Sequence, residues 1–577
     1  MPGFFVSNRN VSLKLINDKQ NKLISEKIGC SNYTIQRNTL KKFIDDKCCY
    51  NDKEYIIIVE GYMLNKNDLY NEYGANNVHD LVINMYKKRG DKFFNEFRGG
   101  CSGCIYVKDI DKWLVWTNHT GDAPVFYYHQ NDVIIFSSQV SYLLDALEKL
   151  NLNLNLDEQA CYQMMTFAFM EGNQTYANEI KRLTAGKYIL IDKGDLSVKE
   201  YHKFKFHADR LKGKTEEEII DLIEKYFVKA IKLEYDKDIE YNYSHFADLS
   251  GGLDSRMGIW VANELGYKPV QCLTYCKADY LDEKIAKELA RYWKFPLLVK
   301  QLDDKSFFYD SEKIIQMNNG LSLYSGITGG KDMLESLDTE KYGLEHTGMI
   351  GDVVLGSFYS SLSDAEKNQP SGKYSSKLVN RLTRTTRQEF DTHELYLLYT
   401  RGLLGAANTY TLRQNYTEVA SPFMNVDFLQ LCMDIPVELR IKHYIYRKWI
   451  LTKHPGAGKF IWEKTGFNLY TNKLLPFLYR ICFKGPRKLL GILGIHISFF
   501  EASSMNPFEY WYHNDAELRN RLKEEFYRNI NYMPKETSET LKTDLCYLFE
   551  SGNVNEKTMA LTVVGACKQY FKNCNKA

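Results

Sequence analysis

The feature that most restricts the fold of this chain is a regular alternation of helical and extended patterns between residues 215 and 302. The expected helices cover 215–235, 257–266 and 282–294, and the expected strands cover 245–249, 270–276 and 296–302. Extended runs separated by helices are typical of parallel sheets, because a crossover of helical length is needed to start each strand in the same direction. We therefore expect an α/β domain with an open parallel sheet, in which ligands bind beyond the carboxyl ends of the strands.

A Gly-rich turn, SGGLDSR, joins the first of these strands to the helix that follows it. Gly251 and Gly252 allow backbone N–H groups to approach an anion closely, and the positive end of the helix favours negative charge. The hydroxyl groups of Ser250 and Ser255 add donors, and Asp254 is a carboxylate suited to a Mg²⁺ ion that bridges phosphates. A shorter motif such as SGG would be explained by a Gly-rich turn that caps a helix. The full six-residue motif at a strand-to-helix junction favours phosphate binding.

The first two hundred residues carry short aromatic or β-branched runs broken by Gly, Asp and Asn, a pattern typical of strands joined by turns. These runs cover 55–61, 100–109, 112–118, 125–138 and 186–196, and apolar residues at helical spacing cover 79–97 and 157–170. The pattern indicates an α+β, sandwich-like domain. The charged segment 201–218 marks the boundary, so we expect domains at 1–205 and 206–577, the second with a helical region from about residue 380 onward.

The length of 577 residues agrees with at least two domains, and 75 Lys and Arg nearly balance 73 Asp and Glu. The net charge of +2 does not favour nucleic acid as a partner. The N-terminus lacks a secretory signal, and no run approaches the length of a transmembrane helix, so a cytoplasmic protein is expected. Thirteen irregularly spaced cysteines suit reduced thiols, and for the CxxC pair Cys101 and Cys104 packing is favoured over metal binding.

The string SGGLDS at 250–255 resembles the pyrophosphate loop of the N-type ATP pyrophosphatases. Its setting resembles the synthetase domain of the asparagine synthetase family, which includes β-lactam synthetases and lasso-peptide cyclases. Further segments resemble motifs of that family: Asp282-Glu283, the second Gly-rich turn at 347–352, Ser421-Pro422-Phe423-Met424-Asn425, and a basic region with Arg447 and Lys464. The resemblance covers nearly the whole chain and assigns ATP binding to Ser250, Gly251, Gly252, Leu253, Asp254, Ser255, Gly348 and Gly351.

In that family a substrate carboxylate attacks the α-phosphorus of ATP, pyrophosphate leaves, and an amine captures the acyl-adenylate to give an amide and AMP. The resemblance therefore implies ATP and Mg²⁺ as cofactors, a small-molecule or peptide carboxylate as substrate, and ammonia or another amine as donor. Asp254 and Asp352, one on each Gly-rich turn, would hold Mg²⁺. Lys464 and Arg447 would stabilise the phosphates or the tetrahedral intermediate, because the leaving pyrophosphate carries several negative charges.

Two positions depart from the asparagine synthetase pattern. Met349 stands where those enzymes carry a Glu proposed to take a proton from ammonia, and a thioether accepts no proton at neutral pH. Val353 replaces a carboxylate beside Asp352, and Glu345 and His346 either supply the missing base or serve as packing residues. The substrate stays open: the alternatives are an amide from a free amine, a lactam or macrolactam closed by an internal amine, and a non-catalytic nucleotide-binding relative.

The first domain resembles a class II glutamine amidotransferase domain in VEGYMLNKNDL (59–69), FFNEFRGGCSGCIYVKD (93–109) and TNHTGDAPVFYY (117–128). Those enzymes use the thiol of a Cys exposed at the N-terminus by removal of Met, with its own amine as the base. Here position 2 is Pro2, and Glu60 stands at the family's oxyanion-hole Asn, where its charge would oppose the oxyanion. We therefore expect a retained scaffold without glutaminase activity, which is similar to the arrangement in β-lactam synthetases.

The stretch 474–500 alternates apolar runs with Arg480, Lys484, Arg487 and Lys488. Such a pattern fits a helix that lies on a membrane surface or, more often, a helix packed on a core with its charges in solvent. A homodimer is one assembly compatible with the sequence.

Overall fold

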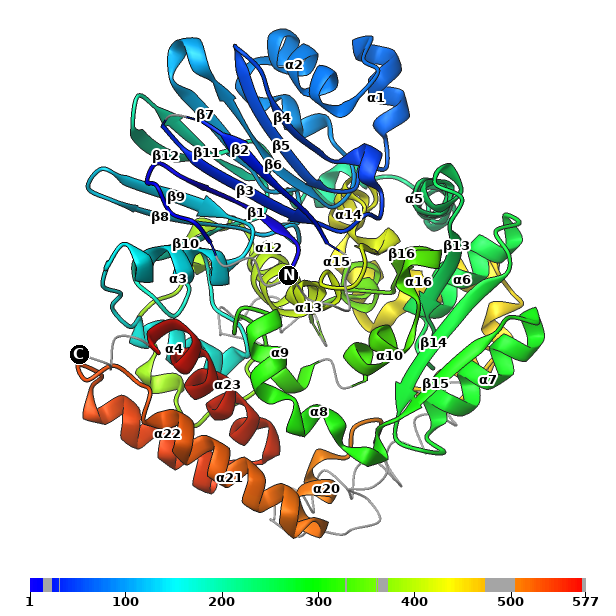
Figure 1. The fold of residues 1–577 in the computed structure, drawn as a ribbon. Helices are drawn as coiled ribbons and strands as arrows, with labels where there is room; N and C mark the ends of the chain where they lie inside the picture. Colours follow the sequence, from blue (N-terminus) through cyan, green and yellow to red (C-terminus); the bar gives the residue numbers. More distant parts are fainter. Residues whose placement is uncertain are drawn as a thin grey trace.

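The computed structural model describes residues 1–13, 23–30, 32–326, 329–359, 361, 372–472 and 504–572. The first two hundred residues form two antiparallel sheets of six strands each (Figure 1). The first sheet has the order β10 (Ile180–Leu183), β8 (Val125–Gln130), β9 (Val133–Ser137), β1 (Gly3–Ser7), β3 (Thr34–Thr39) and β2 (Ile24–Gly29). The second sheet has the order β12 (Asp195–Glu200), β11 (Lys187–Asp192), β7 (Lys112–Trp116), β6 (Cys101–Val107), β5 (Tyr55–Gly61) and β4 (Cys48–Asn51).

The two sheets face each other because their strands are apolar on both sides. On β1, Phe4 and Val6 join Ile58 of β5 in the apolar core between the sheets, whereas Phe5 belongs to the core on the other side of β1. The outer faces are covered by α1 (Lys66–Tyr73) and α2 (Val78–Arg89) on the second sheet and by α3 (Val140–Lys149) and α4 (Glu158–Phe167) on the first. The predicted N-terminal domain with antiparallel, sandwich-like sheets is confirmed.

A parallel sheet of five strands follows later in the chain. Its order is β15 (Leu297–Gln301), β14 (Val270–Cys276), β13 (Ser244–Asp248), β16 (Tyr342–His346) and β17 (Val419–Ala420). The chain enters at β13, runs outward through β14 to β15, and returns to place β16 and β17 on the other side of β13. Open parallel sheets bind ligands beyond the carboxyl ends of their strands at such a reversal. The predicted parallel sheet is confirmed, and the reversal lies between β13 and β16.

Helices cover the parallel sheet and complete the chain. Those around the sheet are α5 (Glu216–Glu240), α6 (Asp254–Glu264), α7 (Leu281–Trp293), α14 (Val426–Asp434) and α16 (Tyr444–Lys453). Shorter helices are α8 (Ser306–Tyr309), α9 (Ser311–Met317), α10 (Gly330–Ser336), α12 (His393–Leu397), α13 (Tyr410–Arg413) and α15 (Val437–Arg440). The chain ends in α20 (Phe508–Asn514), α21 (Ala516–Ile530), α22 (Glu539–Ser551) and α23 (Val554–Phe571), which share an apolar core with α3 and α4 (Figure 1). The predicted helical C-terminal region is confirmed, and we propose residues 205–206 as the domain boundary, between β12 and α5.

Several element boundaries differ from the prediction. The helix expected over 79–97 ends at Arg89, because Gly90 adopts a φ of +67° that closes it. The run 125–138 is a hairpin whose turn contains Asn131 at a φ of +52°. The helix expected from residue 257 begins at Asp254, inside the Gly-rich motif. The strands β16 and β17, of 5 and 2 residues, were not predicted.

Cys101 and Cys104 of β6 are buried on opposite sides of their sheet, in two different apolar cores. The two thiols therefore pack as predicted and face no common ligand. Within the described ranges, no helix has both the length and the apolar character needed to cross a bilayer. The stretch 474–500, considered above for membrane contact, lies outside the described residues.

Candidate functional site

The two Gly-rich turns meet at the carboxyl ends of β13 and β16. The first turn leads from β13 into α6, and the second follows β16 directly. A Cβ atom on Gly348 would lie 2.4 Å from the backbone nitrogen of Ser255, and one on Gly351 would lie 2.7 Å from Cγ of Asp254. Any larger residue at either position would push the turns apart, so the second turn is shaped to fit the first.

Asp254 occupies the point of contact between the turns. Its Oδ2 accepts the backbone N–H of Asp352 at 2.9 Å, and its Oδ1 accepts the hydroxyl group of Tyr446 at 2.9 Å. Burial and the negative charge of Asp352 raise the pKa of Asp254 to about 8. Asp254 is partly buried and Asp352 is exposed. Two neighbouring carboxylates of this kind favour a cation between them.

The first turn is held by its own hydroxyl groups. Ser255 Oγ accepts the N–H of Ser250 at 3.0 Å, Ser250 Oγ accepts the N–H of Gly252 at 3.2 Å, and the two hydroxyl oxygens are 3.0 Å apart. Because each hydroxyl group carries one hydrogen, one joins the two oxygens and the other can donate to a ligand. The N–H of Gly251 donates to Oδ1 of Asp282 at 2.7 Å. Asp282 therefore shapes the turn, and burial raises its pKa to about 6.

The predicted basic region is seated against the same turn. Arg256, fully buried, donates to the carbonyl oxygens of Gly251 and Ala457 at 3.2 Å each. The N–H of Glu463 donates to the same carbonyl oxygen of Gly251 at 3.1 Å. These bonds hold the segment that carries Lys464 beside the first turn.

Lys464 and Arg447 lie near each other across His443. Lys464 is exposed, and its Nζ donates to Nε2 of His443 at 3.4 Å. Burial, together with the positive charges of Lys464 and Arg447, lowers the pKa of His443 to about 4. The imidazole is therefore neutral at physiological pH and orients the ammonium group of Lys464 without cancelling its charge. The structure thus brings the predicted residues Asp254, Asp352, Lys464 and Arg447 into one site.

Sequence reasoning missed two residues of this site, Tyr446 and His443. Tyr446 precedes the predicted Arg447 on α16, and its hydroxyl group contacts Asp254 across 192 positions of the chain. His443 has a left-handed φ of +58°, and no motif marks it. The adjacency of Tyr446 to Arg447 is a signal in the sequence, but only the fold shows which of them reaches the carboxylate.

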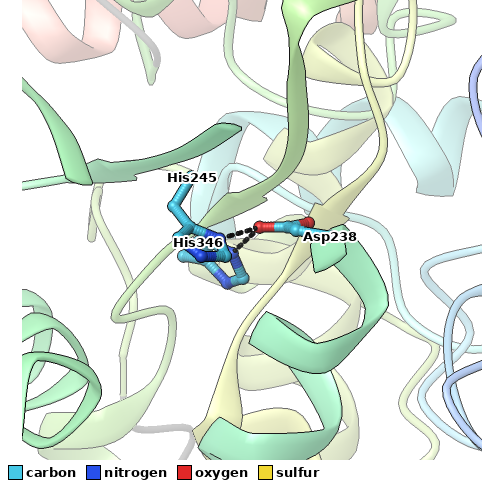
Figure 2. A group of neighbouring side chains, drawn as sticks. All are labelled: Asp238, His245 and His346. Carbon is cyan, nitrogen blue, oxygen red and sulfur yellow. Dashed lines mark hydrogen bonds and ion pairs between the residues drawn. The ribbon is translucent and has the colours of Figure 1, made fainter. Parts of the chain in front are cut away.

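Glu345 and His346 do not serve this site as bases. Glu345 is buried and forms an ion pair with Arg413. His346 is buried and lies 2.8 Å from Asp238 (Figure 2). Its other ring nitrogen lies 3.3 Å from Glu234. Burial by itself would lower the pKa of His346, but the carboxylate of Asp238 raises it to about 9. An imidazole that is already protonated accepts no further proton, so the structure favours the packing alternative for both residues.

We expect His346 to make the stability of the protein depend on pH. Its pKa is about 9 in the folded protein and roughly 6.5 in an unfolded chain. Its contribution to stability is therefore fully present below a pH of roughly 6.5 and is lost as the pH rises through the folded-state pKa. The contribution is on the order of 3 kcal/mol, since one pK unit corresponds to about 1.4 kcal/mol. Melting temperatures of the wild-type protein and of His346→Gln should differ more at mildly acidic than at strongly alkaline pH, and a difference that does not change with pH would contradict the ion pair.

An ion pair fills the position of the expected oxyanion donor in the N-terminal domain. Glu60, near the end of β5, pairs with Arg37 of β3, and its second oxygen accepts the hydroxyl group of Thr39 at 2.8 Å. Arg37 is 2% and Glu60 is 8% exposed, so the charges are withdrawn from water. Pro2 precedes β1 next to this region, because Gly3 pairs with Asn38 of β3. This end of the two sheets is occupied by the protein's own charged side chains.

Comparison with known proteins agrees with the motifs. Residues 18–202 match the model of a family described as a glutamine amidotransferase domain. The putative asparagine synthetase (glutamine-hydrolyzing) 2 of Methanocaldococcus jannaschii is 24% identical over 231 residues, which are 38% of this chain and 43% of that protein. The match thus spans less than half the length of this relative. The predicted similarity to class II amidotransferase domains and to asparagine synthetases is confirmed.

Solved structures give more distant likenesses. The glutamine phosphoribosylpyrophosphate amidotransferase of B. subtilis aligns with a TM-score of 0.24 and 8% identity over 52% of this chain and 85% of its own. The NMN synthetase of Francisella tularensis aligns with a TM-score of 0.17 and 19% identity over 21% of this chain and 51% of its own. These values are too low to support an inference about function.

Proposed function

We propose that this protein is an ATP-dependent amide-forming ligase of the asparagine synthetase type. It would adenylate a carboxylate, release pyrophosphate, and pass the acyl group to an amine to give an amide and AMP. The observation that carries this proposal is the contact of the two Gly-rich turns at Asp254, beyond the carboxyl ends of β13 and β16. Similarity to an asparagine synthetase supports the amide-forming class. The parallel sheet would then be an ATP pyrophosphatase-like domain.

The residues at the two turns fit Mg²⁺ and ATP. Mg²⁺ prefers carboxylate oxygens and phosphates as ligands, and Asp254 and Asp352 present such oxygens side by side. When bound there, Mg²⁺ would neutralise phosphate charge and orient the leaving pyrophosphate. Of the two hydroxyl groups of Ser250 and Ser255, one remains free to donate to a phosphate oxygen. The first turn of α6 would add positive partial charge at the same place.

Lys464 and Arg447 are assigned as the catalytic cations. Negative charge increases on the α-phosphate and on pyrophosphate as the carboxylate attacks, and oriented cations lower the energy of that state. Lys464 has a flexible stem, and neutral His443 orients its ammonium group near Asp254. Arg447 lies on α16, and its positive charge acts on His443, the residue that Lys464 contacts, so we assign it as the second cation.

The amine that captures the adenylate must lose a proton without help from position 349. Met349 lies between the two glycines of the second turn, and its carbonyl oxygen accepts the hydroxyl group of Ser421 at 3.1 Å. Its thioether cannot act as a base. We propose that the amine arrives neutral and releases its proton to solvent or to a group of the bound substrate after attack.

We further propose that the N-terminal domain does not hydrolyse glutamine. A glutaminase site needs a nucleophile and a donor for the oxyanion, and here a buried carboxylate, Glu60, stands in the donor position beside Arg37. The amine would then be free ammonia or, in the second candidate function, an amine of the substrate itself that closes a lactam. Met349 favours the second candidate, because an internal amine is positioned by its own molecule.

The test measures AMP and pyrophosphate formed from Mg²⁺-ATP with aspartate, with ammonium, with both and with neither. Turnover that requires both would establish an ammonia-dependent asparagine synthetase. Exchange of labelled pyrophosphate into ATP would show that a carboxylate is adenylated, and sustained AMP formation from that carboxylate without added ammonium would favour the internal-amine alternative. A protein that binds Mg²⁺-ATP but gives neither product nor exchange with any carboxylate tested would be the non-catalytic relative.

A further inference from the structure

The last turn of α5 contacts both the N-terminal domain and β16, the strand that leads into the second Gly-rich turn. Two neighbouring residues of this turn, Lys237 and Asp238, point their side chains to the two sides. Lys237 reaches Asp46 of the N-terminal domain, and Asp238 reaches β16. Both side chains are completely buried. Because a charged group of this kind is rarely buried without a partner, each contact constrains the position of α5.

The contact with the N-terminal domain is a buried ion pair. Asp46 is fully buried, and its Oδ1 lies 2.7 Å from Nζ of Lys237 and 3.0 Å from Nζ of Lys66. Its Oδ2 accepts the backbone N–H of Met63 at 2.7 Å, just beyond β5. Removing Lys237 would leave buried Asp46 with only one of its two lysine partners, which is more costly than losing an exposed ion pair. Asp46 therefore holds the end of α5 firmly against the N-terminal sheets.

Both oxygens of the Asp238 carboxylate contact β16. Oδ1 accepts the backbone N–H of Leu344 at 2.7 Å, and a Cβ atom on Gly343 would lie 1.9 Å from the same oxygen, so only glycine allows the approach. Oδ2 meets Nδ1 of His245 and Nε2 of His346 at 2.8 Å each (Figure 2). His346 is the last residue of β16 and precedes the second Gly-rich turn by one residue.

The N-terminal domain also supports the edge of the parallel sheet beyond β16. Lys42 donates to the carbonyl oxygen of Gly343 at 3.0 Å and to the hydroxyl group of Thr417 at 2.6 Å. The hydroxyl group of Tyr62 donates to the carbonyl oxygen of Val419 in β17 at 2.9 Å. A two-residue edge strand has little intrinsic stability and is held by what covers it. The contacts of Lys42 and Tyr62 thus agree with those of Asp46 in placing support for β16 and β17 in the N-terminal domain.

We propose that the N-terminal domain positions the second Gly-rich turn, through the linked contacts Asp46–Lys237 and Asp238–His346. Lys237 and Asp238 are positioning residues: neither touches the turns, but together they fix the end of β16 from which Gly348 and Gly351 approach Asp254. The proposal rests on the proposed function for its importance to ATP binding. It gives a physical reason for a domain that carries Glu60 paired with Arg37 to remain part of the molecule.

The cluster of Asp238, His245 and His346 could in principle hold a transition metal, since its three donor atoms lie within 4.8 Å of one another. Both imidazoles, however, are already at hydrogen-bond distance from one carboxylate oxygen, and the second nitrogen of His346 faces Glu234 at 3.3 Å. Structural zinc sites use four ligands, and the described residues here offer three donors in a buried place. Hydrogen bonding accounts for the geometry of all three side chains. We therefore assign the cluster as a hydrogen-bonded contact and not as a metal site.

The test compares the full-length chain with Lys237→Met and with the matched control Lys232→Met, an exposed lysine on the same helix. Hydrogen exchange followed by mass spectrometry reports on the peptide that contains 344–352, with the peptide over β14 as an internal reference. We expect exchange in 344–352 to quicken, and the Kd for Mg²⁺-ATP to rise about tenfold, in Lys237→Met alone. Lys237→Arg, which keeps the charge, should restore both values toward those of the wild-type protein.

Three outcomes would overturn the proposal. Faster exchange confined to the amides around Met63, with 344–352 unchanged, would show that the ion pair acts only on the interface. A loss of protection over the whole chain in Lys237→Met, repeated in Asp46→Asn, would show a global and not a positional effect. One equivalent of transition metal in the purified protein, lost in His245→Ala, would replace the hydrogen-bonded contact by a metal site. Hydrogen exchange in 344–352 can be measured without ATP. A wild-type protein that binds no Mg²⁺-ATP would therefore contradict the proposed function, while the exchange comparison would still test the positioning of the second turn.

Discussion

Replacing Asp254 by Asn is expected to lower the rate of pyrophosphate release from ATP by about a thousandfold, the range found when one oriented group that stabilises a transition state is removed. Asn keeps the shape of the side chain: its amide oxygen can accept the N–H of Asp352, and its NH2 group can donate to the hydroxyl oxygen of Tyr446, so the contact between the turns is retained. It removes the negative charge that would hold Mg²⁺ beside Asp352. The rate should be measured as pyrophosphate formed under saturating Mg²⁺-ATP with the carboxylate found to support turnover.

The control for this variant is Asp209→Asn, which changes a side chain that is 92% exposed. That variant should keep the wild-type rate and melting temperature. Asp254→Asn should also keep its melting temperature or gain slightly, because the wild-type carboxylate is partly buried next to a like charge and its pKa is raised to about 8. Equal rates in Asp254→Asn and wild type would show that the two turns do not form a catalytic site and would restore the non-catalytic alternative.

Glutamine is expected not to serve as the nitrogen donor: glutamate should form no faster with the protein than in buffer, in the presence or absence of ATP and the carboxylate. The reason is the buried ion pair of Arg37 and Glu60, which places a negative charge where a developing oxyanion would need donors. A glutaminase that lost its oxyanion donor would be slowed by a factor of about 10² to 10³, and loss of the nucleophile would remove the remainder.

Glutamate should be measured by an enzyme-coupled assay alongside AMP, with ammonium replacing glutamine in a parallel reaction. Amide formation with ammonium but not with glutamine would agree with a domain that is retained for positioning. Glutamate that appears at the rate of AMP would contradict this view and would place a working glutaminase site in the N-terminal domain. Glu60→Gln should leave both results unchanged, because it removes the charge without adding a nucleophile.

Local sequence was a good guide wherever one segment carries both the pattern and the contact. In SGGLDSR the glycines and the hydroxyl groups of Ser250 and Ser255 act within a few residues of each other. The alternation of strands and helices is likewise a local pattern, and the structure has the predicted parallel sheet with the turn at the end of β13. It was a poor guide to short strands. β16 and β17 are short, and the neighbouring strands and the N-terminal domain supply their hydrogen bonds.

The sequence by itself determined the two kinds of sheet and the position of the first Gly-rich turn, and it placed Asp254 and Asp352 on the two turns that the structure brings together. Only the tertiary structure decided that Tyr446 and His443 belong to the site, and that Glu345 and His346 do not. It alone placed Lys237 between Asp46 and the strand that leads to the second turn. The physical reason is burial: partners that are far apart in the chain come together only when the core closes, and their ionisation and orientation are set by that closed environment.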